Sequence, residues 1–359
     1  MEAIGNKLEN PVRAYAFDQL LILPGLGKIE PSEIDISVKI GGLRLKAPLI
    51  SAPMDTVTGS RLAIALALRG GLGVIHRNCS IEQTVKMIRM VKSEKVPDSN
   101  ALAPRDRQGR LAVGAGLSPM DIKRATALYG EADLLFIDVA SFHNRKLVEG
   151  AKRIIGATGA KIVVGNFGTA DGVRYAIEEL GEENVSAVKV GMGGGSICTT
   201  TDVSGVGSPS TFAIEQAALA LKQMNLLQRI PIIGDGGISK PRDVAIAIGL
   251  GASAVMLGKV FAACEESCAK TVWRSGEKYK VYWGMGSAQA RKKRMALDRY
   301  QDYQKGKQID EGVKMYLRVS GSVENAVGAI EGSLRVGMGY VGAGNLQEMH
   351  QKSMVVARA

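Results

Sequence analysis

Short apolar runs rich in Val and Ile recur along the chain, and most of them end in or near Gly, Asp, His or Asn. Continuous apolar runs of this length are typical of strands that are buried on both faces, as in a parallel sheet. The pattern predicts eight such strands, within residues 47–54, 71–76, 111–116, 133–140, 161–166, 187–191, 231–237 and 252–258.

Amphipathic helical patterns alternate with these runs, and several of them are followed by a glycine that can end a helix. The clearest cover residues 60–70, 81–93, 171–181 and 242–251. Eight strands that alternate with helices predict an α/β fold, a (β/α)₈ TIM barrel, rather than an open doubly wound sheet. We expect one catalytic domain over residues 1–359, and this interpretation depends on the strand count.

In a barrel of this kind, functional groups gather at the carboxyl ends of the strands. The pattern therefore brings Asp138, Asn166, the loop after Gly191, Asp235 and Gly258 to one mouth. The ends of strands seven and eight often bind phosphate through backbone N–H groups. Here they read "GDGGIS" and "MLGK", which predicts a phosphorylated ligand, although "GDGG" alone is also typical of a plain turn.

The loop at residues 191–210 holds six glycines and seven hydroxyl-bearing residues around a single cysteine, Cys198. One interpretation is an inert loop thiol. The other is a nucleophile on a mobile loop that closes over a substrate. A zinc site is disfavoured because zinc needs several nitrogen or sulfur ligands. A Cys–His pair would need His76 or His143, and the spacing neither supports nor excludes one.

A long polar stretch, residues 276–322, follows the eighth predicted strand before helical periodicity returns. Loops of this length within a barrel are usually lids or disordered segments. We predict a mobile flap, with plain disorder as the alternative.

Composition limits the class of protein. With 46% hydrophobic and 23% charged residues, no long apolar run and no signal pattern at the N-terminus, the chain is expected to be cytoplasmic. Its four cysteines are expected to be reduced. The formal charge of +11 suits an anionic small molecule or nucleic acid, but the basic run at 291–294 lacks interleaved aromatics, so nucleic acid is disfavoured.

Several motifs then occur in a recognisable order: "APMDTVT" (52–58), "GGGSICTT" (193–200), "GDGGI" (234–238), "MLG" (256–258), "YWGMGS" (282–287), "DRY" (298–300), "EGV" (311–313) and "GSLRVGMGYVGA" (332–343). In these motifs the chain resembles the IMP dehydrogenase/GMP reductase family, from "FDQLLILPG" to "GNLQEM". The resemblance implies a barrel enzyme, usually a homotetramer, that acts on a purine nucleoside monophosphate with NAD or NADP.

The resemblance also implies roles for individual residues. Cys198 is similar to the nucleophile that attacks purine C2, and Thr200 to the family's catalytic threonine. Arg299 and Tyr300 are similar to the flap pair that activates water in the dehydrogenases. The implied nucleotide contacts are Asp235 at the ribose, Ser196, Gly237 and Gly258 at the phosphate, and Met54, Tyr282, Met285, Gly286 and Glu311 in the rest of the site.

The cofactor and a cation are implied in the same way. Asp138 resembles a residue near the nicotinamide ribose, and we group Asn166 and Gly191 with it as cofactor-binding residues. The backbone carbonyls of Gly193, Gly195 and Cys198 resemble a monovalent-cation site, which makes potassium a candidate ligand.

Departures from the family pattern bear on the direction of the reaction. Ala52 and Lys259 stand where dehydrogenases have phosphate-binding serines, and we predict that Lys259 binds the phosphate as a point charge. Residues 93–110 form a short link where most dehydrogenases insert a CBS module. Reductases share Ala52 and the missing module, but they place a glutamate where this chain has Ala288, and they lack an Arg-Tyr pair. We favour oxidation of IMP to XMP, with reduction of GMP as the alternative.

Overall fold

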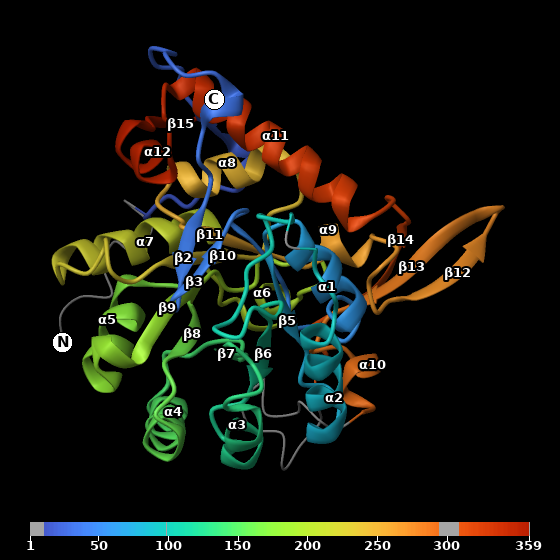
Figure 1. Ribbon diagram of the computed structural model, residues 1–359. Coiled ribbons are helices and arrows are strands. Elements are labelled where there is room, and N and C mark those ends of the chain that lie inside the picture. Colours follow the sequence, from blue (N-terminus) through green and yellow to red (C-terminus); the bar gives the residue numbers. More distant parts are fainter. Residues whose placement is uncertain (1–10, 98, 294–308, 359) are drawn as a thin grey trace.

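The computed structural model describes residues 11–97, 99–293 and 309–358, and a closed barrel of parallel strands lies at its centre (Figure 1). Each of its eight strands overlaps one of the predicted apolar runs, and nearly every strand residue is buried. The strands are β4 (Leu49–Ser51), β5 (Leu72–Ile75), β6 (Gly114–Leu117), β7 (Leu134–Ile137), β8 (Ile162–Phe167), β9 (Val185–Val190), β10 (Ile232–Asp235) and β11 (Ala254–Leu257).

Helices cover the outside of the barrel, and the four that the sequence predicted are present as α1, α2, α5 and α8. Local signals explain their ends. Ser80 and Gln83 form a capping box at the start of α2, and Gly181, with φ +82°, ends α5. The helices are α1 (Ser60–Leu68), α2 (Ile81–Lys92), α3 (Ile122–Leu128), α4 (Arg145–Thr158), α5 (Ala170–Leu180), α6 (Thr200–Ser204), α7 (Ser210–Gln223) and α8 (Pro241–Gly249).

The eighth β/α unit carries a large insertion. After β11 and α9 (Lys259–Ala262), the strands β12 (Lys270–Arg274), β13 (Glu277–Trp283) and β14 (Lys314–Arg318) form a three-stranded antiparallel sheet. Its β12–β13 hairpin projects from the barrel (Figure 1). The short helix α10 (Ala288–Arg291) follows β13, and α11 (Val323–Val341) then packs between α8 and α1 to complete the helical ring.

Part of the predicted flap, residues 276–322, has regular secondary structure. Residues 277–283 and 314–318, which the polar pattern assigned to a loop, are paired strands. Their polarity reflects a small sheet with exposed faces rather than an absence of structure. Arg299 and Tyr300, the predicted flap pair, lie outside the described residues.

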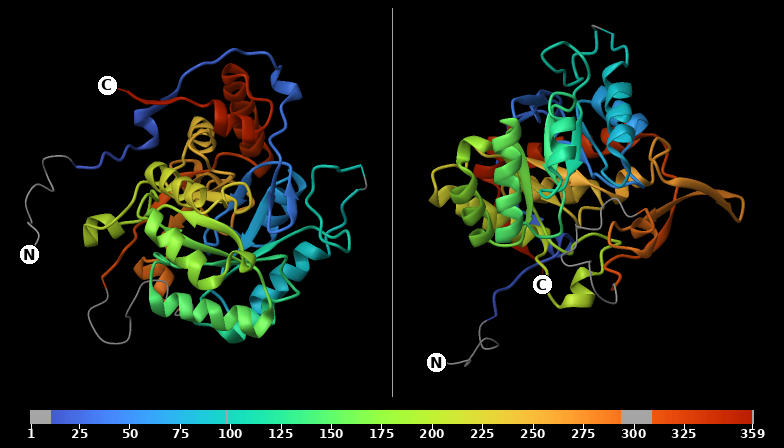
Figure 2. Two further views of the ribbon diagram at one scale, coloured as in Figure 1. Left: turned by 90° about the vertical axis from the view of Figure 1, so that its left-hand side faces the viewer. Right: turned by 90° about the horizontal axis from the view of Figure 1, so that it is seen from below.

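A hairpin lies at the end of the barrel opposite its mouth, and a short sheet joins segments near the two ends of the chain. The turn at Gly41, between β2 (Val38–Ile40) and β3 (Leu43–Leu45), contacts Leu134 and Ser186 at the starts of β7 and β9, so the hairpin covers the amino end of the barrel. Near the two ends of the chain (Figure 2), β1 (Leu20–Ile22) pairs with β15 (Val355–Ala357). The remaining elements are the 3₁₀ helices η1 (Phe17–Gln19), η2 (Pro31–Glu33) and η3 (Glu182–Asn184), and helix α12 (Leu346–Lys352).

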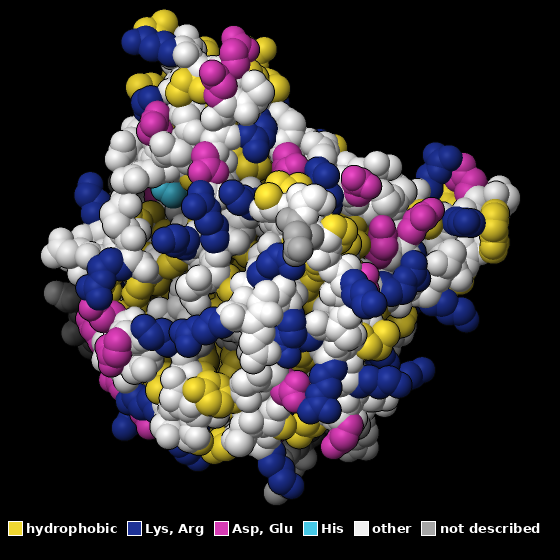
Figure 3. Space-filling view, in the orientation of Figure 1, with side chains coloured by type: hydrophobic (Ala, Val, Ile, Leu, Met, Phe, Trp, Pro, Cys, Tyr) yellow, Lys and Arg dark blue, Asp and Glu magenta, His cyan; other side chains and the backbone are white. Residues whose placement is uncertain are grey.

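The surface shows no single basic patch on the face seen in Figure 3, where Lys and Arg side chains are spread over the barrel and the projecting hairpin. Within the described ranges, no helix is both long and apolar enough to cross a membrane.

Candidate active site

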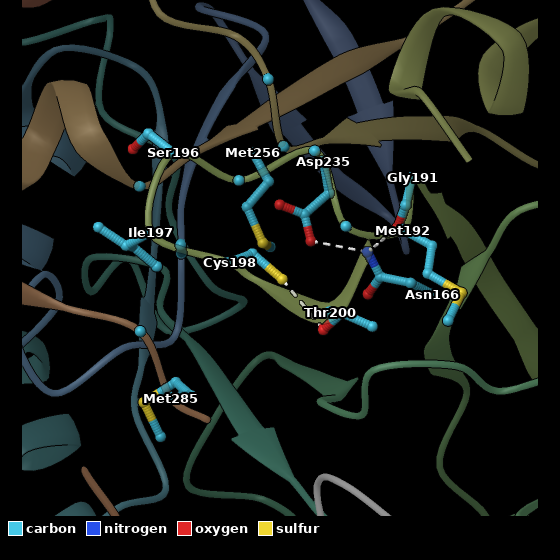
Figure 4. Close-up of a pocket in the computed structure, with 18 of the residues that line it drawn as sticks. Asn166, Gly191, Met192, Ser196, Ile197, Cys198, Thr200, Asp235, Met256 and Met285 are labelled. Atoms are coloured by element: carbon cyan, nitrogen blue, oxygen red, sulfur yellow. Dashed lines mark hydrogen bonds between the residues drawn. The ribbon is translucent and has the colours of Figure 1, made fainter. Parts of the chain in front are cut away.

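The carboxyl ends of the barrel strands open into one pocket (Figure 4). The ends of β4, β8, β9, β10 and β11 and the loop after β9 form most of its wall, and the inserted segment contributes Tyr282, Gly284, Met285 and Glu311. Most of the residues that the sequence assigned to a site line it: Met54, Asn166, Gly191, Gly193, Gly195, Ser196, Cys198, Thr200, Asp235, Gly237, Gly258, Lys259, Tyr282, Met285 and Glu311.

Two predicted residues lie beside the pocket instead of on its wall. Asp138 is buried with its carboxylate 3.5 Å from Arg77 Nε, and the residues at this strand end that reach the pocket are Val139 and Ala140. Gly286 is buried behind Met285, where its carbonyl accepts the amide hydrogen of Glu311 at 3.2 Å.

Cys198 lies in the glycine-rich loop after β9, and its thiol faces a chain of polar side chains. Cys198 Sγ donates to Thr200 Oγ1 at 3.2 Å, and Thr200 Oγ1 donates to Glu311 Oε2 at 2.8 Å. The helices predicted from the sequence do not include one near this cysteine, yet α6 begins at Thr200. That helix turn places Thr200 back toward the thiol and leaves it almost fully buried.

The other side of this chain is fixed by the insertion. Cys198 forms an isolated antiparallel bridge with Gly312, and the amide of Thr199 donates to the carbonyl of Glu311 at 3.2 Å. Glu311, which follows Cys198 by more than a hundred positions, therefore reaches the thiol through backbone pairing.

Neither histidine considered as a partner lies at the thiol. His76 lines a different cavity beside α2, where burial lowers its pKa to about 4 and keeps the imidazole neutral at neutral pH. His143 packs against the ring of Tyr175. In the part of the chain that the structure describes, no histidine lines the main pocket.

Asp235 at the end of β10 anchors a second polar group on the opposite wall. Asn166 Nδ2 donates to Asp235 Oδ2 at 3.0 Å and to the carbonyl of Gly191 at 2.7 Å. Gly191 has φ +117°, and a Cβ there would lie 2.1 Å from the carbonyl oxygen of Asp235, so only glycine allows this approach. The sequence missed Lys189, whose Nζ lies 2.9 Å from Asp235 Oδ2; the signal was a lysine inside the apolar run "AVKVG".

A third corner of the pocket surrounds Gly258 and includes the ammonium group of Lys259. A Cβ on Gly258 would lie 2.8 Å from Tyr282 Oη, 3.6 Å from Met54 Sδ and 3.8 Å from Ala52 Cβ, so these four residues meet at one point. Lys259 begins α9 directly after Gly258 and lines the same corner. Backbone, an ammonium group and the nearby Gly236–Gly237 turn suit an anion here.

Tyr282 closes the pocket from the β13 side. Burial, with smaller contributions from Asp235 and Cys198, raises the pKa of Tyr282 above its usual value. Its hydroxyl therefore remains a hydrogen-bond donor at neutral pH and reaches Met54 Sδ at 3.8 Å.

The insertion is also tied to the barrel next to Met54. Asp55 accepts a hydrogen bond from Trp283 Nε1 at 3.0 Å and from Asn78 Nδ2 at 2.9 Å, and its carboxylate lies 2.8 Å from Lys293 Nζ. One buried carboxylate thus binds the insertion on both sides of α10.

Among the described residues, no group of three or more His, Cys, Asp or Glu side chains is placed to hold a metal ion. All four cysteines are free thiols, as the sequence predicts.

Comparison with known proteins agrees with this geometry. Residues 14–359 match the family model described as the IMP dehydrogenase / GMP reductase domain. The chain is 32% identical to the inosine-5'-monophosphate dehydrogenase of Korarchaeum cryptofilum, over 95% of this chain and 93% of the relative. It is 33% identical to the enzymes of the same name from Methanocaldococcus jannaschii (98% and 94% covered) and Cryptosporidium parvum (97% and 93% covered).

The lengths of these alignments also differ. Those with the two archaeal relatives extend over 451 and 472 positions, more than the 359 residues of this chain, so both relatives contain residues without a counterpart here. The alignment with the Cryptosporidium enzyme covers only 380 positions.

Proposed function

The chain belongs to the IMP dehydrogenase/GMP reductase family, and from that membership we propose that it oxidises IMP to XMP in guanine nucleotide synthesis. The observation that carries the proposal is the hydrogen-bonded chain from Cys198 through Thr200 to Glu311 inside the main pocket. A thiol with an acceptor and a carboxylate behind it is the arrangement that covalent catalysis requires.

The proposed binding mode assigns each wall of the pocket to one part of the nucleotide. Asp235 binds the ribose hydroxyls. Ser196, Gly237, Gly258 and Lys259 surround the phosphate, and Met54, Tyr282, Met285, Gly286 and Glu311 form the remainder of the nucleotide site. In this arrangement the purine C2 faces Cys198.

The first chemical step joins Cys198 Sγ to purine C2. The thiol proton moves to Thr200 Oγ1 as Thr200 gives its own proton to Glu311, the direction in which both hydrogen bonds point. A nicotinamide cofactor bound beside Asn166 and Gly191 would supply the acceptor for the hydride that leaves C2. The purine then remains attached to Cys198 through a thioimidate.

The second step is hydrolysis of that adduct. A water molecule adds at C2: one of its protons passes to Arg299, with Tyr300 and Thr200 on the path, and the other ends on N3 of XMP. The C2–Sγ bond breaks, and the proton held by Glu311 since the first step returns through Thr200 to Sγ, which restores the free thiol. Arginine is otherwise always protonated, so Arg299 acts as a base only in a site that favours its neutral form.

Asp138, Asn166 and Gly191 are the proposed cofactor-binding residues, for NAD or NADP. Asn166 and Gly191 lie on the pocket wall, where the glycine loop leaves mostly backbone and therefore room for a flat ring beside Cys198. We also propose potassium as a ligand of the carbonyls of Gly193, Gly195 and Cys198. The Gly195 carbonyl already accepts the Cys198 amide at 2.9 Å, so activity in KCl against tetramethylammonium chloride tests this point.

We further propose a cytoplasmic homotetramer in which residues 1–359 form one catalytic barrel domain, with residues 93–110 as a short link in place of a CBS module, a flap within 276–322, and no nucleic-acid partner. Light scattering of the purified chain measures the assembly.

The deciding assay follows nicotinamide absorbance with IMP and NAD or NADP, and separately with GMP and NADPH. Formation of reduced cofactor from IMP supports the proposal. Consumption of NADPH with GMP alone would establish the reductase instead. Ala52, which reductases share, lines the phosphate corner and is the observation that keeps this second candidate.

A further inference from the structure

We infer that Lys189 is a positioning residue: it fixes Asp235 so that one carboxylate oxygen is presented to the nucleotide ribose. This inference rests on the proposed nucleotide binding. Lys189 lies on β9 with 1% of its side chain exposed, and its Nζ is 2.9 Å from Asp235 Oδ2. The side chain of Asp235 is 20% exposed and lines the pocket. The lysine therefore holds the carboxylate from behind, away from the ligand.

The two oxygens of Asp235 differ in their surroundings. Oδ2 accepts hydrogen bonds from both Lys189 Nζ and Asn166 Nδ2. Within the described residues, no hydrogen bond involves Oδ1. Because the ammonium group of Lys189 and the amide of Asn166 both bind Oδ2, the other oxygen remains available to accept hydrogen bonds from hydroxyl groups.

Lys189 orients Asn166 as well. Its Nζ donates to Asn166 Oδ1, so the amide nitrogen of Asn166 must point toward Gly191 and Asp235. The strand register explains how Asn166 reaches this place. Gly165 pairs with Lys189 and Phe167 with Val190, which leaves Asn166 as an extra residue between them. A bulge of this kind turns a side chain out of the regular alternation.

The backbone is built to allow this cluster. A Cβ on Gly165, where φ is +155°, would lie 2.3 Å from the carbonyl oxygen of Lys189. Glycine at this position lets β8 come close enough to β9 for the lysine, the amide and the carboxylate to meet.

The test measures binding of IMP and of 2′,3′-dideoxy-IMP, which lacks the hydroxyls, to the full chain and its variants. Lys189→Met should weaken IMP binding about 10- to 100-fold, the range for losing a hydrogen bond to a charged group, and should leave the dideoxy nucleotide nearly unchanged. Lys189→Arg, which keeps the charge, should retain part of the preference for IMP. At saturating IMP, kcat should fall far less than affinity, because Lys189 has no contact with Cys198.

A double variant keeps the test decisive if Lys189→Met alone does not fold. Lys189→Met with Asp235→Asn removes both charges together, and it should bind IMP as Asp235→Asn alone does. Unchanged affinity and hydroxyl preference in Lys189→Met, or a double variant much weaker than Asp235→Asn, would overturn the inference. Failure of the unaltered chain to bind IMP would instead count against the proposed function.

Discussion

Two segments that carry a cysteine follow β9 and β11, the strands on either side of β10, and the two thiols differ in exposure and in hydrogen-bond partner. Cys198 lies in the glycine-rich loop after β9, is partly exposed to the pocket, and donates to a threonine that is bound to a carboxylate. Cys264, just after α9, is fully buried and donates to the carbonyl of Val260 at 3.5 Å. Burial raises the pKa of Cys264 to about 11.

The difference shows what separates a reactive thiol from a packed one in this fold. Both segments lie near the carboxyl ends of strands, so position in the barrel does not decide reactivity. The decisive features are access to the pocket and a proton acceptor within reach. The pocket ends along α9: Lys259 at the start of this helix lines the pocket, whereas Cys264, which follows its end, does not.

Replacement of the two thiols gives the largest contrast. Cys198→Ser should lower turnover at least about a thousand-fold, because the covalent route is lost, and should keep nucleotide affinity. Cys79→Ser, Cys264→Ser and Cys268→Ser should retain substantial activity. Steady-state assays and a binding titration measure both effects. If Cys198→Ser turns over near the rate of the unaltered enzyme, Cys198 is not the nucleophile.

The acceptor behind Cys198 is tested next. Glu311→Gln keeps the shape of the side chain but removes the carboxylate that accepts the Thr200 hydroxyl. Turnover at saturating nucleotide should fall about 10²-fold, at the lower end of the range for acid–base groups. The matched control is Glu277→Gln on β13, which pairs with Arg318 at the surface and should leave turnover unchanged. Equal effects of the two substitutions would show that the carboxylate of Glu311 has no role in proton transfer.

Lys259→Ala tests where the pocket ends along α9. If the ammonium group pairs with the substrate phosphate, nucleotide binding should weaken by about 1.5–3 kcal/mol. Lys270→Ala, at an exposed position on β12, is the control and should bind normally. Calorimetric titration of both variants decides the point, and an unchanged Kd for Lys259→Ala would place that side chain outside the phosphate site.

Alkylation gives the mildest contrast and needs no substitution. At pH 8 the raised pKa of Cys264 leaves about one thiolate in a thousand, and its burial blocks access, so iodoacetamide should spare it. Cys198 should react, the exposed Cys268 should react more slowly because burial of its thiol and the nearby Asp55 raise its pKa, and IMP should protect Cys198 alone. Peptide mass spectrometry with and without IMP reads out each site. Protection of Cys268 to the same degree would mean that the nucleotide does not bind over Cys198 specifically.

The barrel was predictable because its strands are short, apolar and buried on both faces, so each leaves a continuous signal in the sequence. The inserted sheet was not, because β13 carries Glu277, Lys278 and Lys280 among its first four residues, and this charge pattern resembles that of a loop. A continuous apolar run identifies a strand that is buried on both faces, and it cannot identify a strand with one exposed face.

The site was predicted as a set of residues but not as a set of contacts. The family motifs identified Cys198, Thr200 and Glu311, whereas the direct bond from Thr200 to Glu311 depends on the return of the insertion to the β9 loop. Lys189 was missed for a different reason. A single lysine within an apolar run does not show which carboxylate it pairs with, and the partner of Lys189, Asp235, lies on another strand.

The backbone pairs at Val313 have a consequence for how the length of the insertion can vary. The amide of Gly284 donates to the carbonyl of Val313, and the amide of Val313 donates to the carbonyl of Ile197. The chain between Gly284 and Val313 therefore begins and ends at the same place, next to the loop that carries Cys198. The entropy of closing such a segment grows only slowly, by about 0.6 kcal/mol for each doubling of its length. A change in chain length between Gly284 and Val313 should therefore leave these backbone pairs intact, so related enzymes can diverge here without rebuilding the barrel as long as the proposed catalytic pair is retained.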